Sequence, residues 1–474
     1  MKLVLAALSL VVAVSAQPLQ LHPENPHYFQ FDGKPVVLIT SGEHYGALLN
    51  KDFDYERYLD TLHSNRLNLT RVFSGSYREV QGNFEIKDNT LAPAPDKFIT
   101  PWLQRDGKFD LTRWDEAYFT RLKKLLSYAR RKDVIVELVL FCPLYEDSMW
   151  LVSPMNILNN LNGVGDVART DVLALKNVGL TEVQDSMVRK IVSELREFDN
   201  VYYEICNEPY FQGVTLAWQA HIAQLISETE ASFAKKHLIA QNWANGSTLI
   251  DRPDPLVSLY NFHYSRPPAS VAMNWNLKRA IGNNETGFDG ASNDTYRIQA
   301  WDFLMAGGAL FNNLDYSFTV GHEDGTFAPP AATPGGGSAT LRRQLEYLRV
   351  FFDQIPFWRM QPTAEDTVRG PAGASIRALE ESGKIYAVYI HHGHAIKDGK
   401  PAFQLDTAAA SRQLIVHLPR GKYVAKWRDT RTGLDLKVEQ LEVTSPGNEL
   451  RLASPVYSED IALVLRAVNA SGAH

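Results

Sequence analysis

The chain has 474 residues, a formal net charge of −6 and only two cysteines. Acidic and basic residues are interspersed, so the sequence offers no basic field for a nucleic acid and no polybasic patch for a membrane surface. Two cysteines exclude a disulfide framework and a cysteine-based zinc site. The length exceeds that of one ordinary domain and predicts a large domain with a smaller module.

Residues 1–16 have the pattern of a secretory signal peptide, with one cation at Lys2, an apolar run and small residues before Gln17. The apolar run is too short to span a bilayer, and no later segment approaches about 18 consecutive apolar residues. The sequence therefore predicts a secreted or periplasmic protein without a membrane anchor.

Residues 17–360 alternate strand-like apolar runs with amphipathic helical stretches, which is typical of repeated βα units around a parallel sheet. Eight strands are expected, at residues 36–40, 67–73, 134–141, 201–206, 237–243, 256–264, 277–285 and 309–317. The predicted fold is α/β, a (β/α)8 TIM barrel. Long loops follow the second, third and eighth strands, at the edge where barrels of this kind carry their active sites.

Residues 361–474 show short runs of period-two alternation and no helical pattern, as in KIYAVYIHH and DIALVLRAV. This pattern predicts a small C-terminal β-sandwich domain. The apolar linker IPFWRMQ predicts that this domain packs against the barrel and stabilises it.

The stretch VYYEICNEPY, residues 201–210, is a buried strand that runs directly into Asn207 and Glu208. Proline at 209 ends the strand ladder, so the Glu208 carboxyl group is expected at the active edge of the barrel. Glu285 ends the seventh predicted strand and provides a second carboxyl group. Two carboxyl groups placed in this way indicate glycosidic bond cleavage, with Glu208 as acid/base and Glu285 as nucleophile.

These residues resemble those of a clan of retaining (β/α)8 glycoside hydrolases, near the cellulase-like family 5 and the apiosidase-like proteins. The resemblance covers most of residues 24–357, and the C-terminal module is similar to the β-domain often appended to such barrels. It implies an Asn-Glu acid/base pair, matched by Asn207 and Glu208, and a nucleophile matched by Glu285. It also implies substrate-site roles for three further residues, namely Arg71, His263 and Tyr264.

The chain departs from family 5 in three ways. It has no histidine after the third strand, and Asp315 and Tyr316 stand in the region where the family has a tryptophan. His263 and Tyr264 are also adjacent, whereas the family commonly separates them by one residue. The sugar and the linkage therefore stay open. We expect the Asn207 amide to bind the sugar 2-hydroxyl, and Tyr264 or Tyr316 to orient Glu285. Glu204, on the same strand as Glu208, is expected to pair with Arg71 inside the barrel.

Four further residues are candidates for substrate binding. Glu43 and His44 follow the first strand and either contact sugar hydroxyls or shape a loop. Trp150 and Trp243 lie near the rim and either stack on sugar rings or pack in the core.

The sequence thus predicts a secreted retaining glycoside hydrolase that acts on an oligosaccharide or polysaccharide of plant or microbial origin. No cofactor and no metal are expected. The alternative is a non-catalytic carbohydrate-binding barrel. Glu208 is expected to hold a proton because Glu285 is close, and Cys142 and Cys206 are expected to be free thiols rather than a disulfide.

Overall fold

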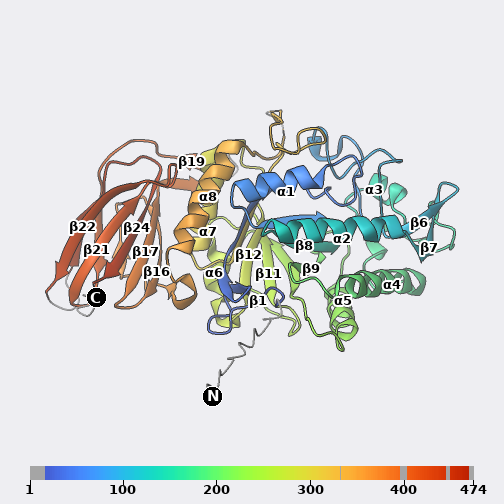
Figure 1. Ribbon diagram of the computed structural model, residues 1–474, viewed down its shortest axis with the longest axis horizontal. Helices are drawn as coiled ribbons and strands as arrows, with labels where there is room; N and C mark the ends of the chain where they lie inside the picture. Colours follow the sequence, from blue (N-terminus) through green and yellow to red (C-terminus); the bar gives the residue numbers. More distant parts are fainter. Residues whose placement is uncertain (1–16, 331–332, 396–402, 445–448, 469–474) are drawn as a thin grey trace, which may run out of the picture.

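The computed structural model describes residues 17–330, 333–395, 403–444 and 449–468 (Figure 1). The predicted signal peptide lies outside the described residues. Within the described part of the chain, no helix is both long and apolar enough to cross a membrane.

The predicted barrel is confirmed. Eight parallel strands follow one another in the spatial order β4-β13-β12-β11-β10-β9-β8-β5. Their bounds are β4 (Leu38–Gly42), β5 (Leu69–Phe73), β8 (Ile135–Phe141), β9 (Val201–Cys206), β10 (Ile239–Asn245), β11 (Leu259–His263), β12 (Ala280–Glu285) and β13 (Leu310–Leu314).

The two edge strands of this sheet, β4 and β5, are joined through Asn68. Its backbone N–H donates to the Ile39 carbonyl at 3.2 Å, and its side-chain Oδ1 accepts from the Ile39 N–H at 2.8 Å. The amide of Asn68 thus replaces part of a strand ladder, and the sheet comes round into a barrel.

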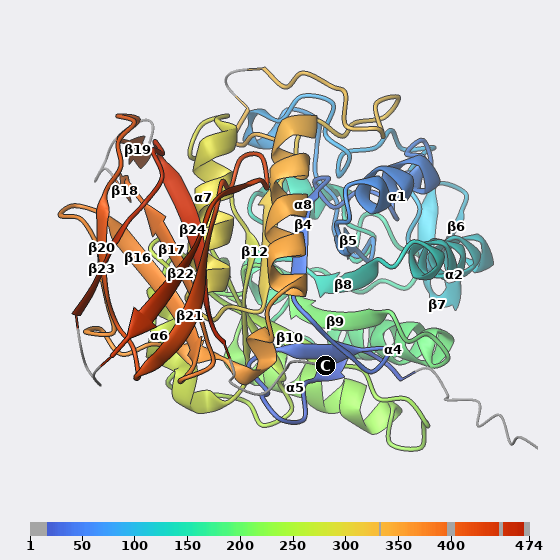
Figure 2. The ribbon, with the colours of Figure 1, turned by 60° about the vertical axis from the view of Figure 1, so that its left-hand side comes forward.

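Helices cover the outside of the barrel (Figures 1 and 2). They are α1 (Tyr55–Ser64), α2 (Glu116–Arg131), α4 (Val178–Leu195), α5 (Leu216–Thr229), α6 (Ala269–Asn274), α7 (Asn293–Met305) and α8 (Ala339–Asp353). Apolar stripes of α1, α2 and α8 face the sheet, whereas α7 is buried on nearly all sides. Side-chain caps such as Asp115 before α2 and Thr215 before α5 accept from free N–H groups of the first turn. The connection between β10 and β11, residues 246–258, contains no helix, so one of the eight βα units lacks its helical half.

The remaining elements of this half of the chain are short. A three-stranded sheet precedes the barrel, formed by β1 (Gln20–Leu21), β2 (Phe29–Phe31) and β3 (Lys34–Val36). The long loop after β5 carries the turn η1 (Asn83–Glu85) and the hairpin β6 (Trp102–Arg105) and β7 (Lys108–Trp114). The loop after β8 carries α3 (Asp147–Val152) and the turn η2 (Arg169–Asp171); η3 (Trp275–Leu277) and η4 (Phe357–Arg359) follow α6 and α8.

The C-terminal part consists of antiparallel sheets, as predicted. One sheet has the order β14-β16-β17-β24-β21-β22 and a second has the order β15-β20-β23. The strands are β14 (Gln361–Pro362), β15 (Val368–Arg369), β16 (Ser375–Glu381), β17 (Ile385–His391), β18 (Gly393–Ala395), β19 (Phe403–Leu405), β20 (Gln413–His417), β21 (Gly421–Arg428), β22 (Asp435–Val443), β23 (Glu449–Ala453) and β24 (Asp460–Ala467). Residues of both sheets, including Val416 and Leu463, share one apolar core, so the domain is a sandwich.

This sandwich packs against α7 and α8 through buried polar and aromatic contacts (Figure 2). Arg297 of α7 donates from Nη2 to Asp460 Oδ1 at 2.7 Å, and both side chains are fully buried. Trp301 stacks on Tyr389 with ring centroids 5.4 Å apart. A buried ion pair and a stacked aromatic pair hold the two parts of the chain together.

We expect a truncated protein that ends at Met360 to aggregate or to melt well below the full chain, because truncation uncovers Trp301 and leaves Arg297 without Asp460. Thermal unfolding and size-exclusion chromatography check this.

The full-length Asp460→Ala variant should lose about 3–5 kcal/mol of stability, because it also leaves Arg297 without Asp460. A soluble truncated protein with the melting temperature of the full chain would contradict the stabilising role.

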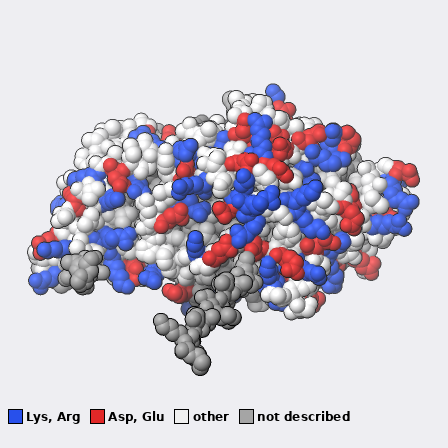
Figure 3. Space-filling view, in the orientation of Figure 1, with Lys and Arg blue, Asp and Glu red and all other residues white. Residues whose placement is uncertain are grey.

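Positive and negative side chains lie next to one another on the face shown in Figure 3. Many charged groups of the protein pair across neighbouring elements, such as Lys132 with Asp60 at 2.6 Å and Arg130 with Asp32 at 2.9 Å. The pairing agrees with the interspersed charges of the sequence. Cys142 and Cys206 are both free and buried, as expected.

Candidate active site

The two glutamates predicted to be catalytic lie at the carboxyl ends of barrel strands. All six residues of β9 are buried, and the chain leaves the strand at Asn207 and Glu208. Glu208 adopts a positive φ of 37°, a strained conformation for a residue with a side chain. Glu285 is the last residue of β12 and pairs in the ladder with His263 of β11 after a register shift. This irregularity brings His263 beside both carboxyl groups.

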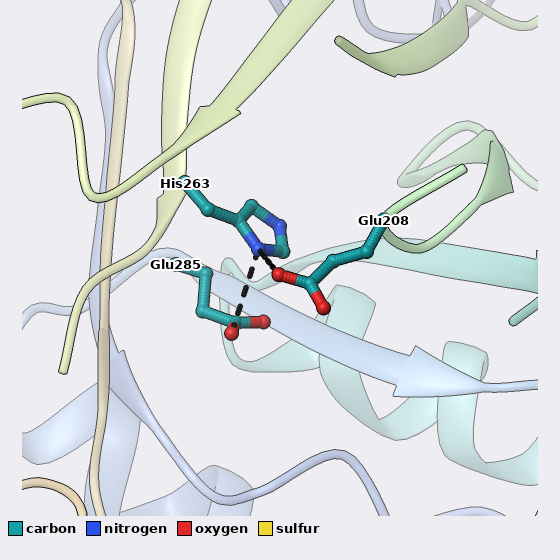
Figure 4. Close-up of side chains that lie close together, drawn as sticks. All are labelled: Glu208, His263 and Glu285. Carbon is teal, nitrogen blue, oxygen red and sulfur yellow. Dashed lines mark hydrogen bonds and ion pairs between the residues drawn. The ribbon is translucent and has the colours of Figure 1, made fainter. Parts of the chain in front are cut away.

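Glu208, His263 and Glu285 point toward one another (Figure 4). The His263 Nδ1 atom lies 3.1 Å from Glu208 Oε1 and 3.5 Å from Glu285 Oε1. One oxygen of each carboxyl group and this nitrogen all lie within 4.8 Å of one another. Retaining glycosidases hold their carboxyl groups about 5–5.5 Å apart, whereas inverting enzymes need about 6.5–9.5 Å. The separation here fits the retaining geometry.

Three donors hold the Glu285 carboxylate. Arg71 donates to Oε2 at 3.1 Å, Tyr45 donates to Oε2 at 3.2 Å, and Tyr264 donates to Oε1 at 2.5 Å. A guanidinium and two phenols fix the direction of the carboxylate. Tyr264 thus has the orienting position expected of it, whereas the Tyr316 hydroxyl has no hydrogen-bond partner among the described residues.

Arg71 is buried and also bonds Glu204 and the Asn207 Oδ1 atom, the latter at 2.7 Å. The expected pair of Arg71 with Glu204 is therefore present. A second buried carboxyl group, Glu137 of β8, lies 3.9 Å from Arg71. Burial and the neighbouring Glu204 raise the pKa of Glu137 well above its usual range. At Glu204, burial also raises the pKa, but the charge of Arg71 outweighs burial and the pKa of Glu204 is lowered. Arg71 thus favours the charged form of Glu204, whereas the environment of Glu137 favours its neutral form.

Glu208 accepts hydrogen bonds from Tyr145 at 2.6 Å and from His263. Burial raises the pKa of Glu208, but these bonds outweigh it, and the resulting pKa lies below the usual range. The structure differs here from the expectation that Glu285 holds a proton on Glu208. The expectation considered only the charge of the second carboxylate, whereas the hydrogen-bond donors that face Glu208 decide the direction of its pKa shift.

The two glutamates open into a pocket with a volume of about 70 Å³. Six of the residues predicted from the sequence line it, namely His44, Asn207, Glu208, Tyr264, Glu285 and Tyr316. Arg71 and His263 lie beneath its floor, where they bond the carboxyl groups. The structure therefore brings together eight of the eleven predicted residues.

Glu43, Trp150 and Trp243 are not among the residues that line this pocket. The Glu43 carboxylate is buried and accepts from the Ala47 N–H at 2.8 Å and from Thr90 at 2.7 Å, so it shapes a loop. Trp150 is buried and donates to the Val167 carbonyl at 3.0 Å. Trp243 lines a separate depression beside Tyr210. The alternatives that the sequence left open for Glu43 and Trp150 are thereby resolved toward loop and core.

Sequence reasoning missed Tyr45, Glu79 and Tyr145, which all line the pocket. Tyr45 immediately follows Glu43 and His44 and has a positive φ of 63°. The sequence pattern does not predict this backbone conformation. Glu79 and Tyr145 come from the long loops after β5 and β8. The length of those loops indicated that they could provide site residues, but length alone does not predict which side chain points into the pocket.

Glu208, His263 and Glu285 also form the one group of metal-ligand type found among the described residues. The Arg71 guanidinium already lies 3.1 Å from Glu285 and provides positive charge there. Bringing a cation to the same carboxylate would place two positive groups together. The donor set therefore does not fit a resident metal.

No family model and no curated protein matches the sequence. Solved structures do match the fold. A glycoside hydrolase shares 14% identity over 95% of this chain and 97% of its own, with a TM-score of 0.61. A glycoside hydrolase of family 5 from Bacteroides vulgatus shares 13% identity over 96% of this chain and 95% of its own, with a TM-score of 0.60. At this identity the likeness establishes a shared fold, which includes the barrel and the C-terminal β-domain.

Proposed function

We propose that this protein is a secreted, retaining glycoside hydrolase. The observation that carries the proposal is the close approach of the Glu208 and Glu285 carboxyl groups, with oxygens within 4.8 Å, at the ends of β9 and β12. The shared fold with glycoside hydrolases supports it. Secretion is part of this proposal and rests on the signal-peptide pattern of the sequence. The substrate class, oligosaccharides or polysaccharides, is also part of it.

Glu285 is the nucleophile of the proposed reaction. Arg71, Tyr45 and Tyr264 donate to its carboxylate and aim it into the pocket. Attack of Glu285 on the anomeric carbon forms a glycosyl-enzyme ester and breaks the glycosidic bond. The leaving oxygen takes a proton from Glu208. Glu208 then removes a proton from the water that releases the sugar with retained configuration.

Glu208 provides the proton for the leaving oxygen, and His263 Nδ1 lies 3.1 Å from Glu208 Oε1. The free site favours the Glu208 carboxylate. The fraction of the enzyme in which Glu208 is protonated therefore reacts, and Glu208 passes that proton to the leaving oxygen. His263 is therefore a positioning residue for the acid and does not touch the sugar.

A screen of aryl glycosides and polysaccharides, with NMR of the first-formed anomer, tests the proposed function. Hydrolysis with retention supports it. Inversion would contradict the assignment of Glu285 as nucleophile. Binding of glycans without any product release would instead indicate a non-catalytic carbohydrate-binding barrel.

The Tyr145→Phe variant should shift the basic limb of the pH profile upward. The Tyr145 hydroxyl stabilises the ionised form of Glu208 and so lowers its pKa. Its removal raises that pKa, and activity that depends on protonated Glu208 then persists to higher pH. The pH dependence of kcat/KM measures the shift, and an unchanged or lowered basic limb would contradict it.

A further inference from the structure

The pocket has a second polar wall that the proposed chemistry does not use. It is formed by His44 after β4, Glu79 in the loop after β5, and Tyr316 after β13. In the strand order, β4 and β13 lie across the barrel from β9, which carries Glu208. The wall therefore faces the side of a bound sugar that is remote from the leaving group.

This wall holds hydrogen-bonding groups that the described residues leave unused. Both ring nitrogens of His44 and the hydroxyl of Tyr316 are buried without a hydrogen-bond partner. The Glu79 carboxylate lies 3.7 Å from His44 and accepts from Tyr77 at 3.2 Å and from Asn89. Burial lowers the pKa of His44, but Glu79 and Glu285 outweigh it and raise the pKa. Buried donors without partners are costly, so a ligand with matching hydroxyls would satisfy them.

The same side of the pocket is covered by one segment, residues 79–91, which we call the covering loop. Its residues Glu79, Phe84, Ile86 and Leu91 line the pocket. Phe84 lies edge-on to Tyr145 with ring centroids 5.6 Å apart. The covering loop thus reaches from the wall of His44 to the loop after β8, above Glu208.

Contacts on both sides hold the covering loop in place. Asn83 donates to Glu146 at 3.0 Å on one side, and Thr90 donates to Glu43 at 2.7 Å on the other. A Cβ at Gly46 would lie 2.3 Å from the Thr90 carbonyl oxygen, so the loop packs directly on the backbone of the first βα loop. A polysaccharide chain cannot continue past this wall without displacing these contacts.

The pocket between the glutamates is small. The 70 Å³ available correspond to about five or six waters, at roughly 10–15 Å³ for each. A space of this size favours one sugar ring over a chain of rings at the closed end of the pocket. The carboxylates of Glu79, Glu208 and Glu285 surround it, which disfavours an acidic sugar.

We propose that the enzyme is exo-acting and removes one uncharged sugar from the end of a glycan, with His44, Glu79 and Tyr316 binding the remote hydroxyls of that terminal sugar. This inference rests on the proposed glycosidase function and names its substrate class. The leaving part of the substrate extends past Glu208 into solvent, away from the wall formed by His44, Glu79 and Tyr316.

The test compares 4-nitrophenyl monoglycosides with the same compounds blocked on their remote hydroxyls by a 4,6-O-benzylidene group, and with the matching uronides. Release of nitrophenol from the neutral, unblocked glycosides, at least roughly 100-fold faster than from the other two, is the expected result. Equal or faster cleavage of the blocked compounds, or of internal bonds in a polysaccharide, would overturn the exo assignment while leaving the glycosidase function intact. Absence of turnover on every glycoside would overturn the proposed function itself, and this inference with it.

Variants of the wall provide a second readout. Glu79→Gln and His44→Ala should raise KM roughly tenfold to 100-fold, because each removes a hydrogen bond to the terminal sugar. On a deoxy glycoside that lacks the contacted hydroxyl, variant and wild type should converge. Glu182→Gln, on the exposed face of α4, is the matched control and should behave as wild type. Equal losses on the hydroxylated and deoxy glycosides would show a structural role and contradict the assignment.

Discussion

Replacing Glu285 by alanine should lower turnover by roughly 10⁴-fold or more, because the variant has no group to attack the anomeric carbon. The fold should survive, since Arg71 keeps its bonds to Glu204 and Asn207. Steady-state kinetics on the best substrate and a thermal melt measure the two effects. Glu182→Gln, which changes an exposed carboxylate far from the pocket, should leave both unchanged.

Azide provides a sharper form of the same experiment. In Glu285→Ala the anion can enter the space left by the carboxylate and attack in its place, so that a glycosyl azide of inverted configuration forms. Arg71, Tyr45 and Tyr264, which hold the native carboxylate, would face the azide. Near-normal activity of Glu285→Ala without azide would show that another group is the nucleophile.

The barrel could be predicted because its strands are apolar runs with helices between them, and this pattern reflects burial on both faces of a parallel sheet. The strand ends could be predicted for the same reason, and with them the positions of Glu208 and Glu285. The missing helix between β10 and β11 shows a limit of this pattern. Residues 246–258 connect the two strands without a helix, so a correct count of strands does not imply a helix after each strand.

The surroundings of the glutamates depend on irregular backbone, which leaves no periodic signal. The register shift before His263 decides that this ring faces both carboxyl groups. Positive φ values at Tyr45, Glu208 and Tyr264 turn side chains that an extended strand would place elsewhere. Sequence reasoning therefore located the strands that carry the site and named His263, but it missed Tyr145 and did not foresee that both residues lower the pKa of Glu208.

Glu208→Ala should separate two classes of substrate. A natural glycan has a poor leaving group and needs the acid, so its hydrolysis should fall by roughly 10²–10⁴-fold. A dinitrophenyl glycoside has a leaving group that departs without a proton, so formation of the glycosyl-enzyme should continue at a rate close to wild type. Release of the sugar then slows, because no base activates the water.

A burst of dinitrophenol followed by a slow steady rate is the expected trace, and the accumulated glycosyl-enzyme can be detected by mass spectrometry. Azide should speed the slow step and give a product of retained configuration, opposite to the product from Glu285→Ala. Equal loss on both substrates would show that Glu208 is not the acid. Neither Glu204 nor Glu43 could readily replace it: Glu204 is fully buried against Arg71, and Glu43 is occupied by Ala47 and Thr90. The proton would then have to come from Tyr145 or His263, the two groups that bond Glu208 from either side.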